Sequence, residues 1–173
     1  FLLSKFDTSR ISDFSYYKEI QINLEEIIGK NLIVNLILFS VFSVIWVVLL
    51  GFGSPLLILS GILFGKWVGT AISTVSISVG ALSLYIIASY FFKDLVNQLL
   101  KDKFEKYIER FQRNEFYYFF AFRLAGGLGI PFFLQNVLPV IFKMKNFNYF
   151  FASFLGFAPI FFIWNTIGSG INK

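Results

Sequence analysis

The feature of this sequence that most restricts its fold is the near absence of charge between Lys30 and Lys93, where Lys66 is the only charged residue. The segments 31–52 and 67–92 are each long enough to cross roughly 30 Å of hydrocarbon as an α-helix. A third such segment covers residues 147–168. Hydrophobic residues make up 57% of the chain and charged residues 14%, which is outside the range of ordinary water-soluble domains. The sequence therefore predicts an all-α, polytopic integral membrane protein.

Two further apolar segments are interrupted by glycine and proline. The first is GFGSPLLILSGILFGKW, which contains Gly51, Gly53, Pro55, Gly61 and Gly65. The second runs from FYYFFAFRLAGGLGI to FFLQNVLPVIF, with Gly126, Gly127, Gly129 and Pro131 at its break. A dozen helical residues cover only about 18 Å, so neither arm of either segment can cross the bilayer. Because non-helical backbone at membrane depth has to be covered by protein or water, we expect two re-entrant helical hairpins.

Small residues follow one face of the predicted span 67–92. They are Gly69, Ser73, Ser76, Gly80 and Ser83, at spacings of three and four. Gly61 and Gly65 extend the pattern upstream, and such residues let another helix approach closely. The favoured interpretation is a packing seam without chemistry. The alternative is a polar lining of serines along a substrate path.

The charged segment 93–115 has apolar residues at helical spacing and predicts an amphipathic helix in the membrane interface. Its five acidic residues are interleaved with six basic ones, which argues against a nucleic-acid-binding face. The mixed polar segment 1–30 predicts a short amphipathic helix at the membrane surface. It begins with FLLSK, which fits either the tail of a longer hydrophobic segment or a processed start. We thus divide the chain into an N-terminal interfacial segment, 1–30, and a membrane domain, 31–173.

The distribution of basic residues predicts a topology. We expect 31–52 to cross outward, 67–92 to return, and both hairpins to re-enter the leaflet from which they came. Twelve basic residues then share one side, namely Lys5, Arg10, Lys18, Lys30, the six of 93–113, Lys143 and Lys145. Only Lys66 and Lys173 lie on the other side, so the shared side is predicted to be cytoplasmic. The hairpins then enter from opposite faces, each followed by a full span, which is the outline of an inverted repeat.

The sequence lacks the residues on which several classes of enzyme depend. The chain has no cysteine and no histidine, which removes thiolate nucleophiles and the commonest zinc ligand. No G-x-S-x-G, H-E-x-x-H or P-loop pattern occurs, and the glycines near residue 127 lack the flanking strand of a dinucleotide site. We therefore expect neither an enzyme nor a cofactor.

Two stretches carry a resemblance to a known family. GSPLLILSGILFGKWVGTAISTVSISVGALSLYIIASYF resembles the first half of the SNARE-associated or VTT domain of the DedA superfamily, with its Gly-x-x-Phe-Gly-x-x-x-Gly pattern. FRLAGGLGIPFFLQNVLP, with Phe120 and Arg123 at an F-x-x-R spacing, followed by FLGFAPIFFIWNTIGSG, resembles the second half. The likeness covers about residues 50–170.

Two departures from the family pattern refine what the resemblance implies. Members thought to couple lipid-carrier transport to protons have carboxylates in their hairpins, whereas every Asp and Glu here lies in 1–30 or 93–115. Phe52 also stands where the family has a proline ahead of Gly-Ser. The resemblance therefore implies the branch associated with lipid scrambling or transport, in a bacterial cytoplasmic membrane.

Arg123 is the one charged residue inside the second interrupted segment. A guanidinium at the centre of a bilayer costs from about 3 kcal/mol to more than 10, depending on the method. In the first hypothesis, the protein translocates lipids or lipid phosphates, and Arg123 binds a phosphate headgroup where the hairpin tips meet. Its predicted binding residues are Arg123, Gly126, Gly127, Gly129, Pro131, Asn136, Gly53, Ser54 and Pro55. In the alternative, a structural or assembly protein, Arg123 donates to free carbonyls of the opposing hairpin.

Asn136 and Asn165 are the other polar residues considered for a headgroup, although a buried Asn more often satisfies loop backbone. The expected partners are membrane lipids, with no nucleic acid, and the sequence leaves the oligomeric state open.

Overall fold

The computed structural model describes residues 31–50, 53–99 and 105–171, and this part of the chain contains helices and turns but no strand. The α-helices are α2 (Leu32–Leu50), α3 (Ser54–Leu99), α4 (Glu105–Arg113), α5 (Glu115–Leu124), α6 (Phe132–Val137) and α7 (Asn146–Gly170). Two 3-10 helices, η3 (Gly126–Gly129) and η4 (Leu138–Val140), flank α6. The all-α prediction is confirmed. The segment 1–30, for which a surface helix was predicted, lies outside the described residues.

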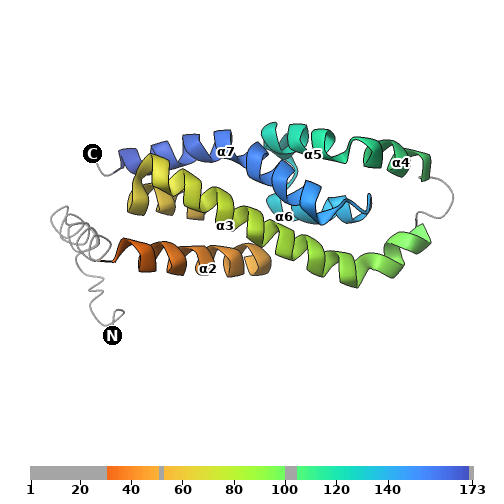
Figure 1. Cartoon of the computed structure of the whole chain (residues 1–173), viewed down its shortest axis with the longest axis horizontal. Helices are drawn as coiled ribbons and strands as arrows, with labels where there is room; N and C mark the ends of the chain where they lie inside the picture. Colours follow the sequence, from red (N-terminus) through yellow and green to blue (C-terminus); the bar gives the residue numbers. More distant parts are fainter. Residues whose placement is uncertain (1–30, 51–52, 100–104, 172–173) are drawn as a thin grey trace.

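Three of the described helices, α2, α3 and α7, are long and apolar enough to cross a membrane. Helices α3 and α7 contain the predicted spans 67–92 and 147–168, and α2 covers most of the predicted span 31–52. Figure 1 shows them lengthwise along the molecule, with α3 between α2 and α7. The second apolar break forms a hairpin from α5, η3 and α6, and α5 lies along α7 (Figure 1).

Helix α3 consists of two arms that meet at Gly65. This residue has φ 72° and ψ 177°, a backbone conformation that favours glycine. The short arm, residues 54–64, folds back against the long arm, residues 66–99. A Cβ atom added to Gly69 would lie 2.7 Å from the carbonyl oxygen of Ser60, so the two arms touch backbone to backbone.

The long arm corrects one prediction. It continues to Leu99, so residues 93–99 belong to α3 and not to a separate interfacial helix covering 93–115. The segment 93–99 contains no glycine or proline, and nothing in it stops the helix as it leaves the apolar stretch. The amphipathic helix of this segment is α4, which is shorter than the predicted one and begins after the undescribed residues 100–104.

The directions of the helices correct the predicted topology. The Phe39 ring lies 5.4 Å from that of Phe64, and Val47, eight residues later, packs against Gly80 farther along α3. Helix α2 and the long arm therefore run in the same direction, and the segment that returns between them is the short arm. The start of α2 and Gly65 lie at one end of the molecule, here called the Gly65 end, and α4 lies at the other, the α4 end (Figure 1).

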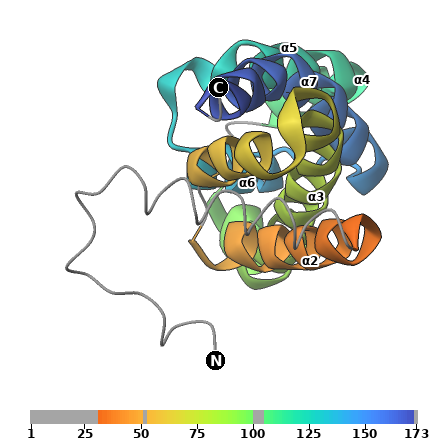
Figure 2. The same cartoon turned by 90° about the vertical axis from the view of Figure 1, so that its left-hand side faces the viewer.

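This arrangement overturns the twelve-to-two count of basic residues. That count placed the start of α2 on the same side as α4, whereas the start of α2 lies with Lys66 at the Gly65 end. Hydropathy could not separate the two arrangements, because glycines stand both before the short arm and after it. Figure 2, which faces the Gly65 end, shows α2, the short arm and the end of α7 together there.

Helices α5 and α7 are joined near the α4 end by a buried carboxylate. Glu115 accepts hydrogen bonds from the backbone nitrogen of Lys145 at 3.2 Å and from Nδ2 of Asn148 at 2.7 Å. Both donors belong to the beginning of α7, so Glu115 caps that helix from outside. Tyr85 of α3 donates to the carbonyl oxygen of Met144 at 2.6 Å. These bonds fix the base of the second hairpin to α7 and α3.

Two clusters of buried apolar side chains fill the interior. The first, near the α4 end, consists of Ala81, Tyr85, Ala88, Phe119, Val140, Met144, Tyr149 and Ala152. The second, toward the Gly65 end, consists of Phe39, Val47, Leu56, Leu57, Ile77, Phe157 and Phe161. The second hairpin contributes to the first cluster and the short arm to the second, so each end of the molecule has its own packed core.

The small-residue face of α3 divides between two neighbours. Gly69 and Ser73 face Asn165 of α7, as Gly61 does from the short arm, whereas Gly80 faces Val47 of α2. The hydroxyl groups of Ser76 and Ser83 donate to carbonyl oxygens of their own helix, of Ile72 and Val79. The glycines therefore lie where helices approach most closely, and these two serines are satisfied locally.

Because the long arm of α3 runs from the Gly65 end to the α4 end, cysteines at the two ends are expected to be labelled from opposite sides of the membrane. Cysteines introduced singly at Lys66 and Arg110, both exposed, should react with a membrane-impermeant maleimide from opposite sides of oriented vesicles. The long arm, which runs from Lys66 to the end where Arg110 lies, is roughly 50 Å long at 1.5 Å per residue, more than the hydrocarbon thickness. The chain contains no native cysteine, so the unaltered protein is the blank. Labelling of both positions from the same side would contradict this arrangement.

Candidate functional site

Arg123, in the last turn of α5, is the largest fully buried side chain of the described residues and is only 1% exposed. Its guanidinium donates to Oε1 of Gln135 at 3.2 Å, to Oδ1 of Asn136 at 2.6 Å and to the hydroxyl oxygen of Tyr149 at 3.0 Å. All three acceptors are uncharged. Gly156 of α7 makes room for this side chain, since a Cβ atom there would lie 2.5 Å from Cβ of Arg123.

Aromatic rings complete the surroundings of the guanidinium. Its central carbon lies 4.6 Å from the ring centres of Phe119 and Phe157, with Tyr149 at 5.7 Å and Phe132 at 5.8 Å. Such cation–π contacts strengthen when water is excluded. No carboxylate among the described residues pairs with Arg123. Within the described part of the chain, its positive charge is therefore stabilised by dipoles and rings and not by an opposite charge.

These contacts correct the bonding pattern proposed for a purely structural Arg123. The acceptors are side-chain oxygens from α6 and α7, and not free carbonyls of the first apolar break. The Nε atom of Arg123 is buried without a hydrogen-bond partner. An arginine has five N–H donors, so the three hydrogen bonds leave donor capacity unused.

Gln135 connects Arg123 to the loop of the second hairpin. Its Nε2 atom donates to the carbonyl oxygen of Ile130 at 2.6 Å while its Oε1 atom accepts from Arg123. The side chain lies directly against Gly127, where a Cβ atom would overlap it, and the φ of Gly127 is 72°. Glycine is required at this position both by the backbone conformation and by the space that Gln135 occupies.

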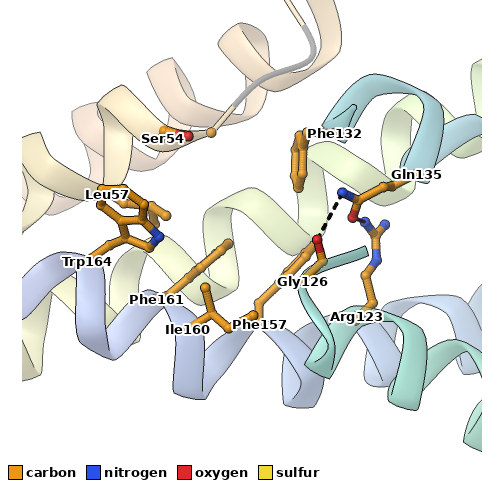
Figure 3. Close-up of a pocket in the computed structure, with 11 residues that line it drawn as sticks. Ser54, Leu57, Arg123, Gly126, Phe132, Gln135, Phe157, Ile160, Phe161 and Trp164 are labelled. Atoms are coloured by element: carbon orange, nitrogen blue, oxygen red, sulfur yellow. Dashed lines mark hydrogen bonds between the residues drawn. The ribbon is translucent and has the colours of Figure 1, made fainter. Parts of the chain in front are cut away.

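A cavity of about 190 Å³ lies beside Arg123. Figure 3 shows Arg123 and Gln135 on one side of it and Leu57 and Trp164 on the other, with Phe157 between them. The cavity is lined by Gly53, Ser54, Leu57, Arg123, Gly126, Phe132, Gln135, Phe157, Ile160, Phe161 and Trp164. Residues from the two apolar breaks, far apart in the sequence, therefore meet at one cavity.

The predicted binding residues divide into two groups. Gly53, Ser54, Arg123 and Gly126 line the cavity, whereas Pro55, Gly127, Gly129 and Pro131 do not. Asn136 lies behind Arg123 as its hydrogen-bond acceptor and is completely buried. The structure thus brings the tips of both breaks together. The other predicted loop residues do not line the cavity.

The start of the short arm adds a second source of positive potential. Ser54 is the first residue of α3, and the N–H groups of Ser54 and Leu56 in its first turn have no partner within the helix, whereas Pro55 has no N–H group. They carry part of the positive end of the helix dipole. Gly53 and Ser54 line the cavity opposite Arg123, so the partial positive charge of this helix end faces the same cavity as the guanidinium.

Asn165 of α7 joins both arms of α3 near the Trp164 side of the cavity. Its Oδ1 atom accepts from Ser60 of the short arm at 2.5 Å, and its Nδ2 atom donates to Ser73 of the long arm at 3.2 Å. We call Ser60, Ser73 and Asn165 the asparagine bracket. Asn165 was considered as a headgroup ligand from the sequence, but its two polar atoms are both engaged inside the protein.

Several residues of the site were missed by reasoning from the sequence. Phe157, Ile160, Phe161 and Trp164 have the spacing of one helical face, so this lining could have been read from α7. Gln135 stands as a polar residue in an apolar segment, which was a usable signal. Nothing in the sequence singled out Tyr149 among the eight tyrosines.

A comparison with protein families bears on this site. A family model of the VTT domain matches residues 47–170. The match includes both apolar breaks, the cavity and all of α3 and α7. No solved structure matches the chain.

Proposed function

Since the chain belongs to the VTT-domain family, we propose that this integral membrane protein moves lipids or lipid phosphates between the leaflets of a bilayer without catalysing a reaction. The observation that carries the proposal is the burial of Arg123, unpaired with any described carboxylate, beside a cavity where two breaks in apolar helices meet. A charge at such a place is expensive and marks a substrate pathway in membrane proteins.

The chemistry of the cavity suits the headgroup of a lipid. An anion between Arg123 and the start of the short arm would receive charge-assisted hydrogen bonds, which are stronger than neutral ones. Guanidinium is also weakly hydrated, which lowers the penalty for using it away from water. The remaining lining is largely aromatic and apolar, as expected for a site that also accepts the first carbons of a lipid tail.

We further propose that both hairpins are re-entrant and form an inverted repeat. The first hairpin is then α2 with the short arm, reversing between Leu50 and Ser54, and not residues 51–67 alone. Its tip, Gly53, contacts Ile77 near the middle of the apolar part of α3, and Arg123 at the second tip contacts Gly156 near the middle of α7. Each hairpin is followed by a long helix, and these two helices run in opposite directions, as in transporters with midplane sites.

The orientation that we propose places the α4 end in the cytoplasm. The basic residues that the structure describes at that end are Lys93, Lys106, Arg110, Arg113, Lys143 and Lys145. Among the described residues at the Gly65 end, Lys66 alone is basic. This asymmetry supports the orientation, because cytoplasmic segments carry the excess of Lys and Arg. A bacterial cytoplasmic membrane remains a prediction.

A second candidate function, a structural or assembly role, is supported by the same hydrogen bonds. Arg123 and Tyr149 fasten the second hairpin to α7, and the asparagine bracket fastens the short arm to it. A protein built only for stability would need these contacts but no cavity.

A flipping assay on the purified chain in liposomes separates the two functions. Fluorescent lipids with a phosphate headgroup are placed in both leaflets, and dithionite added outside bleaches those that reach the outer leaflet. We expect the protein to increase the bleached fraction beyond the outer leaflet's share. If folded protein leaves that fraction unchanged, the structural role is favoured and the translocator is rejected. Protein-free liposomes from the same preparation are the control.

A further inference from the structure

We infer that the ligand enters the cavity sideways from the hydrocarbon of the bilayer, because the protein closes the cavity toward the water at both of its ends. The inference rests on the proposed function in taking the cavity as the ligand site. It names the class of substrate more closely, as a molecule already dissolved in the membrane and not a free anion from solution.

The asparagine bracket, together with the backbone contacts beside it, closes the Gly65 end. Beyond Trp164, α7 packs against the short arm so tightly that a Cβ atom at Gly61 would overlap the carbonyl group of Asn165. One at Gly168 would overlap the carbonyl oxygen of Ile58. Backbone contact of this kind leaves no passage for water between the two helices.

Tyr149 closes the α4 end. Its hydroxyl oxygen accepts a hydrogen bond from Arg123, and its hydroxyl group donates to the carbonyl oxygen of Ala81 on α3 at 3.3 Å. Tyr149 therefore connects the second hairpin to the long arm. Its ring stacks on Tyr85 at 4.5 Å and packs against Phe119 at 4.9 Å. Tyr149 and Arg123 are 0% and 1% exposed, so this layer is dry and continuous with the first apolar cluster.

Between its two ends, the cavity has a side on which several of its lining residues are exposed at the protein surface. Ser54 and Gly126 are exposed, and Trp164 is 38% exposed. Leu128, at the tip of the second hairpin, is 73% exposed. Exposed apolar side chains at the level of membrane-spanning helices face lipid, and loop backbone at that depth has to be covered by protein or water. A lipid headgroup seated against the two tips would supply partners for that backbone.

Spin-label accessibility at a single cysteine in place of Ser54 tests this inference. Molecular oxygen, which dissolves in hydrocarbon, and a water-soluble nickel chelate report which phase reaches the label. At Ser54→Cys we expect strong relaxation by oxygen and weak relaxation by the chelate. Leu38→Cys on the lipid-facing side of α2, 61% exposed, should give the same pattern, and the exposed Lys66→Cys should give the reverse.

Strong relaxation by the chelate at Ser54→Cys would mean a water-filled cavity and would overturn the inference. Weak relaxation by both reagents would mean a closed cavity and would overturn it equally. Adding Asn165→Leu, which removes the bracket, should raise the chelate signal at Ser54→Cys. Ser60→Ala, which removes one bond of the bracket, should raise it less. No rise in either folded variant would show that the bracket does not close this end.

The accessibility pattern is independent of lipid transfer, so the two proposals can fail separately. If the pattern holds and the flipping assay is negative, the cavity opens to lipid but the translocator is wrong. If flipping is observed and the chelate reaches Ser54→Cys, the translocator stands and entry from the bilayer is wrong.

Discussion

Arg123→Ala should abolish lipid flipping while the protein still inserts into membranes, and Arg123→Lys should reduce flipping without abolishing it. Alanine removes the only buried cation of the described residues, and with it the attraction for an anionic headgroup. Lysine keeps the charge but lacks the planar fork that reaches Gln135, Asn136 and Tyr149 together. Flipping and melting temperature should be measured on the same preparations.

The stability of the Arg123 variants separates ligand binding from bracing. Losing the guanidinium removes a donor from three buried oxygen atoms, of which Oδ1 of Asn136 keeps the Tyr149 hydroxyl at 3.4 Å, and each group left unpaired costs about 1–3 kcal/mol. Part of this loss is offset because a buried charge is also removed, so Arg123→Met, similar in length and apolar, should melt higher than Arg123→Ala. A folded but inactive Arg123→Met supports the ligand role.

The matched control for these variants is Arg110→Ala on α4. Arg110 is exposed and has none of the buried contacts of Arg123, so neither flipping nor melting temperature should change. A well-folded and fully active Arg123→Ala protein would contradict both the binding and the bracing role.

The helices of this protein could be predicted from the sequence, but their directions could not. The three long helices follow from local hydropathy, and both breaks follow from glycine and proline. Between Leu50 and Gly65, however, the sequence offers turn residues at both ends of the short arm, and nothing local decides which one reverses the chain beside α2. That choice depends on packing between distant residues, such as Phe39 against Phe64 and Val47 against Gly80.

The candidate site shows the same division between local and distant information. Arg123 was evident as an isolated charge in an apolar segment, and Gly53 and Ser54 were evident as a break. The partners that define their surroundings were not, because Ser60 and Asn165 are 105 residues apart and Tyr149 is 26 residues from Arg123. A single sequence shows which residues are unusual, but contacts at such separations are set by the tertiary fold.

Gly80→Leu should lower the melting temperature in detergent, because the added side chain would force α2 away from the long arm of α3. A Cβ atom at this position would lie 2.9 Å from Cβ of Val47 and 3.3 Å from Cα of Val44, so the helices have to separate. Overpacking costs about 1–3 kcal/mol even where side chains can shift, and here a backbone atom is in the way. In a membrane, where close packing and not the hydrophobic effect holds helices together, that separation is not compensated. Gly170→Leu is the matched control, since no atom lies within 4 Å of the position of its Cβ, and its melting temperature should be unchanged. Equal melting temperatures for the two variants would contradict the close approach of α2 to the long arm, and with it the parallel arrangement on which the first hairpin depends.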